Sequence, residues 1–68
     1  MATKLGKAIG RTIRQIREKK GMTAEQLAWR NGISKGYLSR IESGERIPSV
    51  PMLEKIAKAL GVPLKEFF

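Results

Sequence analysis

Apolar residues recur at intervals of three and four positions along most of the chain, and no segment alternates apolar with polar residues. This spacing gathers apolar side chains on one face of a helix, whereas a half-buried strand needs a period of two. Ile9, Ile13 and Ile16 form the first stripe and predict a helix over residues 7–20. Gly21 is the expected C′ residue, because glycine adopts the left-handed conformation without strain.

Two further helices are predicted by their caps. Thr23 and Gln26 have the spacing of a capping box, in which each side chain bonds the other residue's backbone N–H. This helix is short, because the turn-forming Asn-Gly pair at 31–32 follows closely. Ser34 caps the next helix, which the Ser-Gly pair at 43–44 ends. The inward side chains of this region are predicted to be Leu27, Ala28, Ile33, Leu38 and Ile41.

The last third of the chain predicts a fourth helix and a final turn. Ser49 caps the helix, and Pro51 is tolerated in its first turn because amides there have no partner within the helix. The apolar stripe consists of Leu53, Ile56, Ala57 and Leu60. Gly61 ends the helix, and Pro63 starts a last turn. We therefore expect one all-α domain over residues 1–68, a compact bundle of five short helices.

The charge of the chain is strongly positive and unevenly distributed. The net charge is +8, with a sequence pI near 10.5. Residues 1–46 hold eleven basic and four acidic residues, whereas residues 47–68 hold three and two. A balance this basic indicates a polyanionic partner, nucleic acid ahead of a membrane surface. The first two thirds are therefore expected to hold the binding surface.

The composition argues against several other classes of protein. There is no cysteine, no histidine and no aspartate, so we expect no disulfide, no metal site, no cofactor and no enzymatic activity. No apolar run approaches the ~20 residues that a membrane helix needs, and the short capped helices argue against one long interfacial helix. The basic N-terminus lacks a secretory h-region, so we expect a cytoplasmic protein. We expect no small-molecule ligand.

The segment from Thr23 to Gly44 has the features of a helix-turn-helix. Ala28 is small enough to let the two helices cross closely, and Gly32 supplies a conformation that other residues adopt only with strain. Such a unit is a rigid platform that presents its second helix outward. The outward positions of that helix are Lys35, Gly36, Tyr37, Ser39 and Arg40, which offer hydrogen-bond donors and a flat ring.

Four stretches, in this order and spacing, resemble the helix-turn-helix domains of the phage repressor and Cro (XRE-like) type, which also occur in many small bacterial regulators. The stretches are Ile13–Gly21, Thr23–Ala28, Leu38–Gly44 and Ile56–Val62. The resemblance covers nearly the whole chain, from about Ile9 to Phe67. It implies a lambda-repressor-like fold and a transcriptional regulator that binds double-stranded DNA sequence-specifically through its third helix.

The resemblance also implies a role for individual residues. Base reading falls to Lys35, Gly36, Tyr37, Ser39 and Arg40. Phosphate contacts fall to Thr23, Ala24, Ser34, Ser43 and Arg46. Arg17 and Glu42 match a pair that ties the first helix to the third, which makes Glu42 structural.

The sequence departs from the family pattern at two positions. The family often has glutamine where this chain has Ala24, so a phosphate clamp would be missing or replaced by backbone amides. The family often has a base-contacting side chain where this chain has Gly36. Direct readout would then rest on Lys35, Tyr37 and Arg40.

A domain of this size reads few base pairs, so we expect a homodimer on a near-palindromic operator. The dimer contact is assigned to the least charged segment, at Leu64, Phe67 and Phe68. Core and interface both stay open for the two phenylalanines, including one in each place. An alternative function on the same fold is a protein- or RNA-interaction module, antitoxin-like or ribosome-associated, since fold does not determine function.

Trp29 falls on the outer side of the second helix, opposite Leu27 by helical spacing. We favour a partly buried ring that packs on the first helix or along a long side chain. The other interpretation is a surface for a partner.

Overall fold

In the computed structural model, which describes residues 3–68, each α-helix begins after a serine or threonine whose hydroxyl accepts a hydrogen bond from an amide of the first turn. The capping residues are Thr3, Thr23, Ser34 and Ser49, and their bonds are 2.9–3.3 Å long. They start helices α1 (Lys4–Lys19), α2 (Ala24–Arg30), α3 (Lys35–Ser43) and α4 (Val50–Leu60). A 3-10 helix, η1 (Leu64–Phe67), follows. Each cap satisfies an amide that has no partner within its helix.

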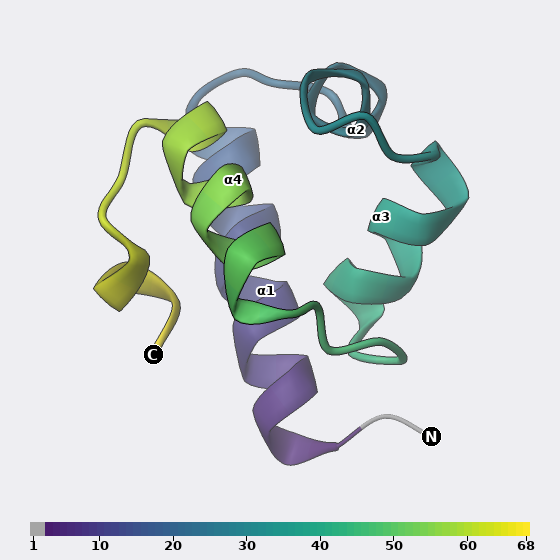
Figure 1. Cartoon of the computed structure of the whole chain (residues 1–68), viewed down its shortest axis with the longest axis vertical. Helices are drawn as coiled ribbons and strands as arrows, with labels where there is room; N and C mark the ends of the chain where they lie inside the picture. Colours follow the sequence, from purple (N-terminus) through teal and green to yellow (C-terminus); the bar gives the residue numbers. More distant parts are fainter. Residues whose placement is uncertain (1–2) are drawn as a thin grey trace.

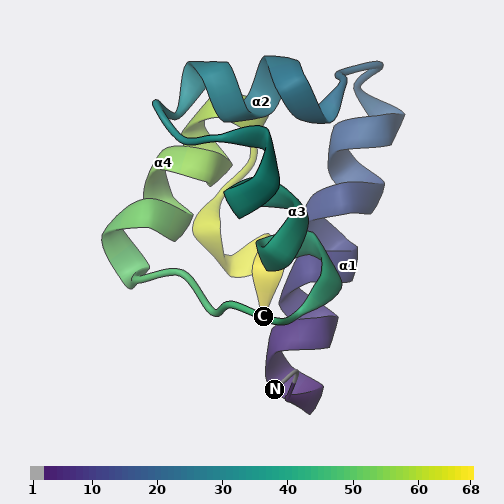
Figure 2. The ribbon, with the colours of Figure 1, turned by 90° about the vertical axis from the view of Figure 1, so that its right-hand side faces the viewer.

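The helices pack around one core, with α2 lying across the end of the bundle (Figures 1 and 2). α1 packs against α3 and η1, while α2 packs against α3 and α4. The core consists of Ile9, Ile13, Leu27, Ala28, Leu38, Ile41, Leu53, Ile56, Ala57, Leu60 and Phe67. The predicted stripes of the first and fourth helices supply six of these residues, and Ile16 and Ile33 are half-buried beside them. This arrangement leaves the opposite side of α3 in solvent.

α1 and α3 approach each other closely through glycines that the sequence analysis did not single out. A Cβ at Gly10 would lie 2.5 Å from the carbonyl oxygen of Glu42, and a Cβ at Gly6 would lie 2.9 Å from that of Gly44. Gly6 and Gly10 are four residues apart, so they lie on the same face of α1. The two helices can pack at this distance only because both positions lack side chains.

Two predictions about the elements need correction. The first helix begins at Lys4 rather than residue 7, because Thr3 caps it and the two glycines inside it are needed for packing. The bundle has four α-helices in the described residues, not five. The fifth element is a four-residue 3-10 helix, closed by an i→i+3 bond from the Glu66 amide to the Pro63 carbonyl at 3.0 Å.

The two terminal phenylalanines differ in burial. Phe67 is 3% exposed and belongs to the core, so of the two places left open for this ring the structure supports the core, and little of it remains for a contact with a second copy. Phe68 is 70% exposed and Leu64 is half-buried. Among residues 3–68, no helix is both long and apolar enough to cross a membrane.

Candidate nucleic-acid interface

The turn between α2 and α3 is held by hydrogen bonds at both of its ends. The Asn31 side chain donates to the Leu27 carbonyl at 2.9 Å, and the Ile33 amide donates to the Ala28 carbonyl at 3.0 Å. Between them Gly32 has φ +64°, a left-handed conformation that a β-carbon would strain. Ala28 is 2% exposed and belongs to the core beside which α2 and α3 pack against each other. The turn therefore fixes the direction in which α3 leaves α2.

α3 is fixed on its inner side and open on its outer side. Leu38 and Ile41 are fully buried, and Gly44 ends the helix in the left-handed conformation with φ +87°. Four of the five predicted base-reading positions, Lys35, Gly36, Ser39 and Arg40, are exposed. The structure thus brings these four positions together on one open surface of a rigid helix, which we call the α3 face.

Tyr37 differs from the other members of this set. Its side chain is half-buried and packs against the core. The Arg46 guanidinium carbon lies 5.8 Å from the centre of its ring, within the range of a cation–π contact. Sequence reasoning missed this contact, because nothing in the spacing shows that the loop after α3 folds back over the ring.

Arg17 and Glu42 form an ion pair between α1 and α3. Arg17 Nε donates to Glu42 Oε2 at 2.8 Å and Nη2 donates to Oε1 at 3.1 Å, while Nη1 donates to the Met22 carbonyl at 2.8 Å. Both side chains are 10% exposed. The hydrogen bonds to Glu42 raise the pKa of Arg17, although burial acts in the opposite direction. Both carboxylate oxygens of Glu42 are thus bonded within the protein, although the residue lies beside the α3 face.

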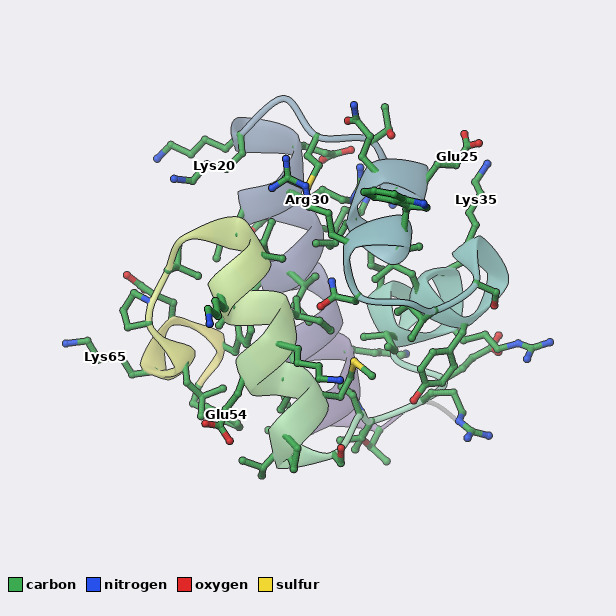
Figure 3. The ribbon with its side chains drawn as sticks, turned by 45° about the horizontal axis from the view of Figure 1, so that its top comes forward. Lys20, Glu25, Arg30, Lys35, Glu54 and Lys65 are labelled. Carbon is green, nitrogen blue, oxygen red and sulfur yellow. The ribbon has the colours of Figure 1, made fainter. Side chains whose placement is uncertain are left out.

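A second, exposed ion pair joins α2 to the start of α3. Lys35 Nζ lies 3.8 Å from Glu25 Oε1, and Figure 3 shows the two side chains pointing toward each other. Their exposed fractions are 65% and 75%, so the attraction is weak and Lys35 is free to exchange partners. Its two residues belong to different helices, so their spacing in the sequence does not predict the pair.

The predicted phosphate contacts are arranged around the ends of α2 and α3. Thr23 and Ser34 are exposed caps whose oxygens accept backbone bonds, so each hydroxyl hydrogen can still be donated. Ser43 donates its hydroxyl hydrogen to the Arg40 carbonyl at 3.1 Å. Arg46 is exposed, whereas the side chain of Ala24 is half-buried against the core. Ala24 can therefore offer a ligand only its backbone.

Trp29 contradicts the interpretation that the sequence favoured. Its side chain is 83% exposed, so the ring does not pack on the first helix or under a long side chain. Leu27 and Ala28 occupy the inward positions of the short α2, and the next residue projects into solvent. The sequence signal for this was the helical spacing itself, which already placed Trp29 opposite Leu27.

Known proteins with related sequences are bacterial regulators. The chain is 49% identical over 61 residues to the HTH-type transcriptional regulator SlrR of Bacillus subtilis. The aligned residues cover 88% of this chain but only 40% of SlrR. The chain thus spans less than half the length of that relative.

Solved structures give the same picture at the level of the fold. The restriction-modification controller protein C.AhdI from Aeromonas hydrophila superposes with a TM-score of 0.88 at 32% identity, over 93% of this chain and 96% of that one. SinR, the master regulator for biofilm formation, solved in complex with DNA, superposes with a TM-score of 0.81 at 38% identity, over 87% of this chain and 95% of that one. The family model described as helix-turn-helix matches residues 13–67. The chain therefore belongs to the helix-turn-helix (HTH_3, XRE-type) family of transcriptional regulators.

Proposed function

We propose that this protein is a transcriptional regulator that binds double-stranded DNA sequence-specifically, with α3 in the major groove. The observation that carries the proposal is the α3 face: exposed Lys35, Ser39 and Arg40 on a helix fixed by its buried side and by the Arg17–Glu42 pair. A helix of this width fits the major groove, where each base pair has its own pattern of donors and acceptors. The related SinR has been solved in complex with DNA, which supports DNA as the partner of this fold.

Specificity and affinity come from different groups in this proposal. Arg40 and Lys35 donate to guanine O6 and N7, the commonest specific contact, while Ser39 bonds a neighbouring base edge. Lys35 leaves the weak pair with Glu25 to do so. Thr23, Ser34 and Arg46 contact phosphates and set the register of α3 in the groove. The role requires no catalytic group and no cofactor.

The binding species is proposed to be a homodimer on a near-palindromic operator. Two domains related by a two-fold axis place two copies of α3 in successive major grooves, about 34 Å apart. Phe68, which is 70% exposed, and the half-buried Leu64 supply the apolar part of the contact. A dimer reads two half-sites, so it distinguishes its operator from other sequences far better than one domain does.

The experiment that tests this function is selection from random duplex DNA by the purified full chain, followed by titration of the selected duplex at several salt concentrations. We expect an enriched near-palindrome whose log affinity falls with log salt by about 0.9 per phosphate contacted. Salt-sensitive binding without an enriched sequence would contradict sequence-specific regulation. A flat salt response would point instead to a protein-interaction module.

A further inference from the structure

The surface around Trp29 includes none of the residues that are proposed to contact DNA. Trp29 is 83% exposed, the most exposed of the large apolar side chains in the described residues. Two open hollows lie on either side of it, and both Trp29 and Arg30 line each of them. Lys20 and Met22 complete the first hollow with the start of α2, and Lys55, Lys58 and Ala59 of α4 complete the second. We call these seven residues the Trp29 face.

The fold itself gives no reason for this ring to be in solvent. Trp29 caps nothing, and its exposure means that it covers almost no apolar surface. An aromatic side chain of this size removes a large apolar area from water only when another molecule covers it. Tryptophan and arginine are the residues most enriched among those that dominate the energy of protein interfaces, and here they are adjacent.

The charges around the ring are almost all of one sign. Lys20, Arg30, Lys55 and Lys58 line the two hollows, and within residues 3–68 none of these four forms an ion pair. The one carboxylate at the edge of the first hollow belongs to Glu25, which lies 3.8 Å from Lys35 on α3. The surface therefore offers an apolar centre inside a rim of cations without partners.

These observations identify the chemistry of the occupant. We propose that the Trp29 face is a docking site for an acidic segment of another protein, whose apolar side chains enter the hollows beside Trp29 while its carboxylates pair with the surrounding cations. A second copy of this chain fits poorly, because a two-fold contact would bring the same cations against each other. A single-stranded nucleic acid needs several rings to stack successive bases, and this face has one.

The cations around Trp29 and the start of α3 lie on different sides of the molecule. In Figure 3 the side chains of Lys20 and Arg30 point away from the Glu25–Lys35 pair, which marks the start of α3. A partner on the Trp29 face thus lies at the side of a molecule whose α3 remains uncovered. The inference rests on the fold and does not require the proposed DNA binding to be correct.

The test uses the full chain and a synthetic amphipathic peptide of glutamate with leucine along one face. Trp29 is the only tryptophan of the protein, so its fluorescence reports directly on this surface. We expect a saturable blue shift with this peptide. Peptides with lysine in place of glutamate, or serine in place of leucine, should produce none.

Variants separate a docking site from general charge attraction. With the peptide labelled and followed by anisotropy, Trp29→Ala and Lys55→Glu should each raise the Kd about tenfold, as expected for a loss of about 1.4 kcal/mol. Lys65→Glu makes the same change of charge on η1, outside the Trp29 face, and should leave the Kd within about twofold. Trp29→Ala should also leave affinity for the selected duplex unchanged.

Three results would overturn the proposal. The first is the absence of a saturable shift with the glutamate–leucine peptide. The second is equal weakening by Lys55→Glu and Lys65→Glu, which would mean attraction to net charge alone. The third is tighter binding of oligothymidylate than of the peptide, lost in Trp29→Ala, which would assign this face to single-stranded nucleic acid.

Discussion

The guanidinium of Arg17 and the carboxylate of Glu42 meet through two hydrogen bonds of 2.8 and 3.1 Å, which join α1 to α3. The third nitrogen of Arg17 bonds the Met22 carbonyl, so the same side chain also holds the segment that leads into α2. The pair thus connects the first helix to both helices of the helix-turn-helix. A free carboxylate beside the α3 face would repel the phosphates of the proposed DNA partner, and here Arg17 neutralises it within the protein.

Replacing Glu42 by alanine should destabilise the protein strongly. The change leaves the Arg17 guanidinium 10% exposed without its carboxylate, and breaking a buried pair costs about 3 kcal/mol. For a domain of this size the melting temperature should fall by more than about 10 °C. Thermal unfolding followed by circular dichroism measures this.

The matched control is Glu18→Ala, which removes the exposed pair with Arg14 at 3.4 Å on α1. Such i,i+4 pairs contribute about 0.3 kcal/mol, so the melting temperature should hardly change. Equal melting temperatures for the two variants would mean that the buried pair contributes no more to stability than the exposed one.

The parts of this fold that the sequence revealed are those determined locally. A cap such as Ser34 or Thr23 works through a residue three positions away, and a left-handed glycine such as Gly32 is required by the turn that contains it. The two long apolar stripes likewise follow from helical geometry alone. For the α3 face, four of the five predicted base-reading positions are exposed for the same reason: burial of Leu38 and Ile41 determines which side remains.

What the sequence did not reveal depends on contacts between distant segments. From the sequence alone, Gly6 and Gly10 are unfavourable residues within a helix. Their role in packing is visible only in the structure, where α3 and its end lie against them. Phe67 and Phe68 are identical in type, and only the packing of η1 decides that the first is buried. The prediction of a partly buried Trp29 was wrong for a different reason. It rested on the general burial of large apolar side chains, whereas this side chain is 83% exposed.

Gly10 inside α1 and Gly36 in the first turn of α3 should respond in opposite ways to alanine. A methyl group at Gly10 would lie 2.5 Å from a backbone oxygen of Glu42, so α1 and α3 must separate, at a cost of about 2 kcal/mol. At Gly36 the nearest atom is Ser34 Oγ at 3.9 Å, so alanine should stabilise α3 by up to about 1 kcal/mol. Urea unfolding of both variants checks the signs, and stabilisation by Gly10→Ala would contradict the close approach of the helices.

The two terminal phenylalanines should separate stability from assembly. Phe67→Ala removes a ring that is 3% exposed, which costs about 3–5 kcal/mol and unfolds much of a domain this small. Phe68→Ala removes a ring that is 70% exposed, so the free energy of unfolding of the dilute protein should stay within about 0.5 kcal/mol of the parent value. Sedimentation equilibrium should show weaker dimerisation for Phe68→Ala. An unchanged dimer dissociation constant would show that Phe68 takes no part in the dimer contact.

The α3 face should lose specific affinity when its cations are removed, without loss of fold. Arg40 is exposed and its side chain takes part in no ion pair of the described residues, so Arg40→Ala should leave the melting temperature unchanged. A lost bidentate contact to guanine costs about 1–3 kcal/mol, which is about 5- to 150-fold in affinity for each half-site of the selected duplex. The loss should be concentrated at one position of each half-site, because a base contact carries sequence information and a phosphate contact does not.

The control for this prediction is Lys19→Ala at the end of α1, an exposed cation far from α3 in sequence and equal in charge. It should weaken binding slightly and equally for all duplexes, since it changes only the overall field. Titration of both variants on the selected duplex and on point-substituted duplexes distinguishes the two effects. If Arg40→Ala keeps full affinity and the full sequence preference while its circular dichroism is unchanged, Arg40 does not read the DNA. If Lys35→Ala is equally silent, the α3 face is not the reading surface.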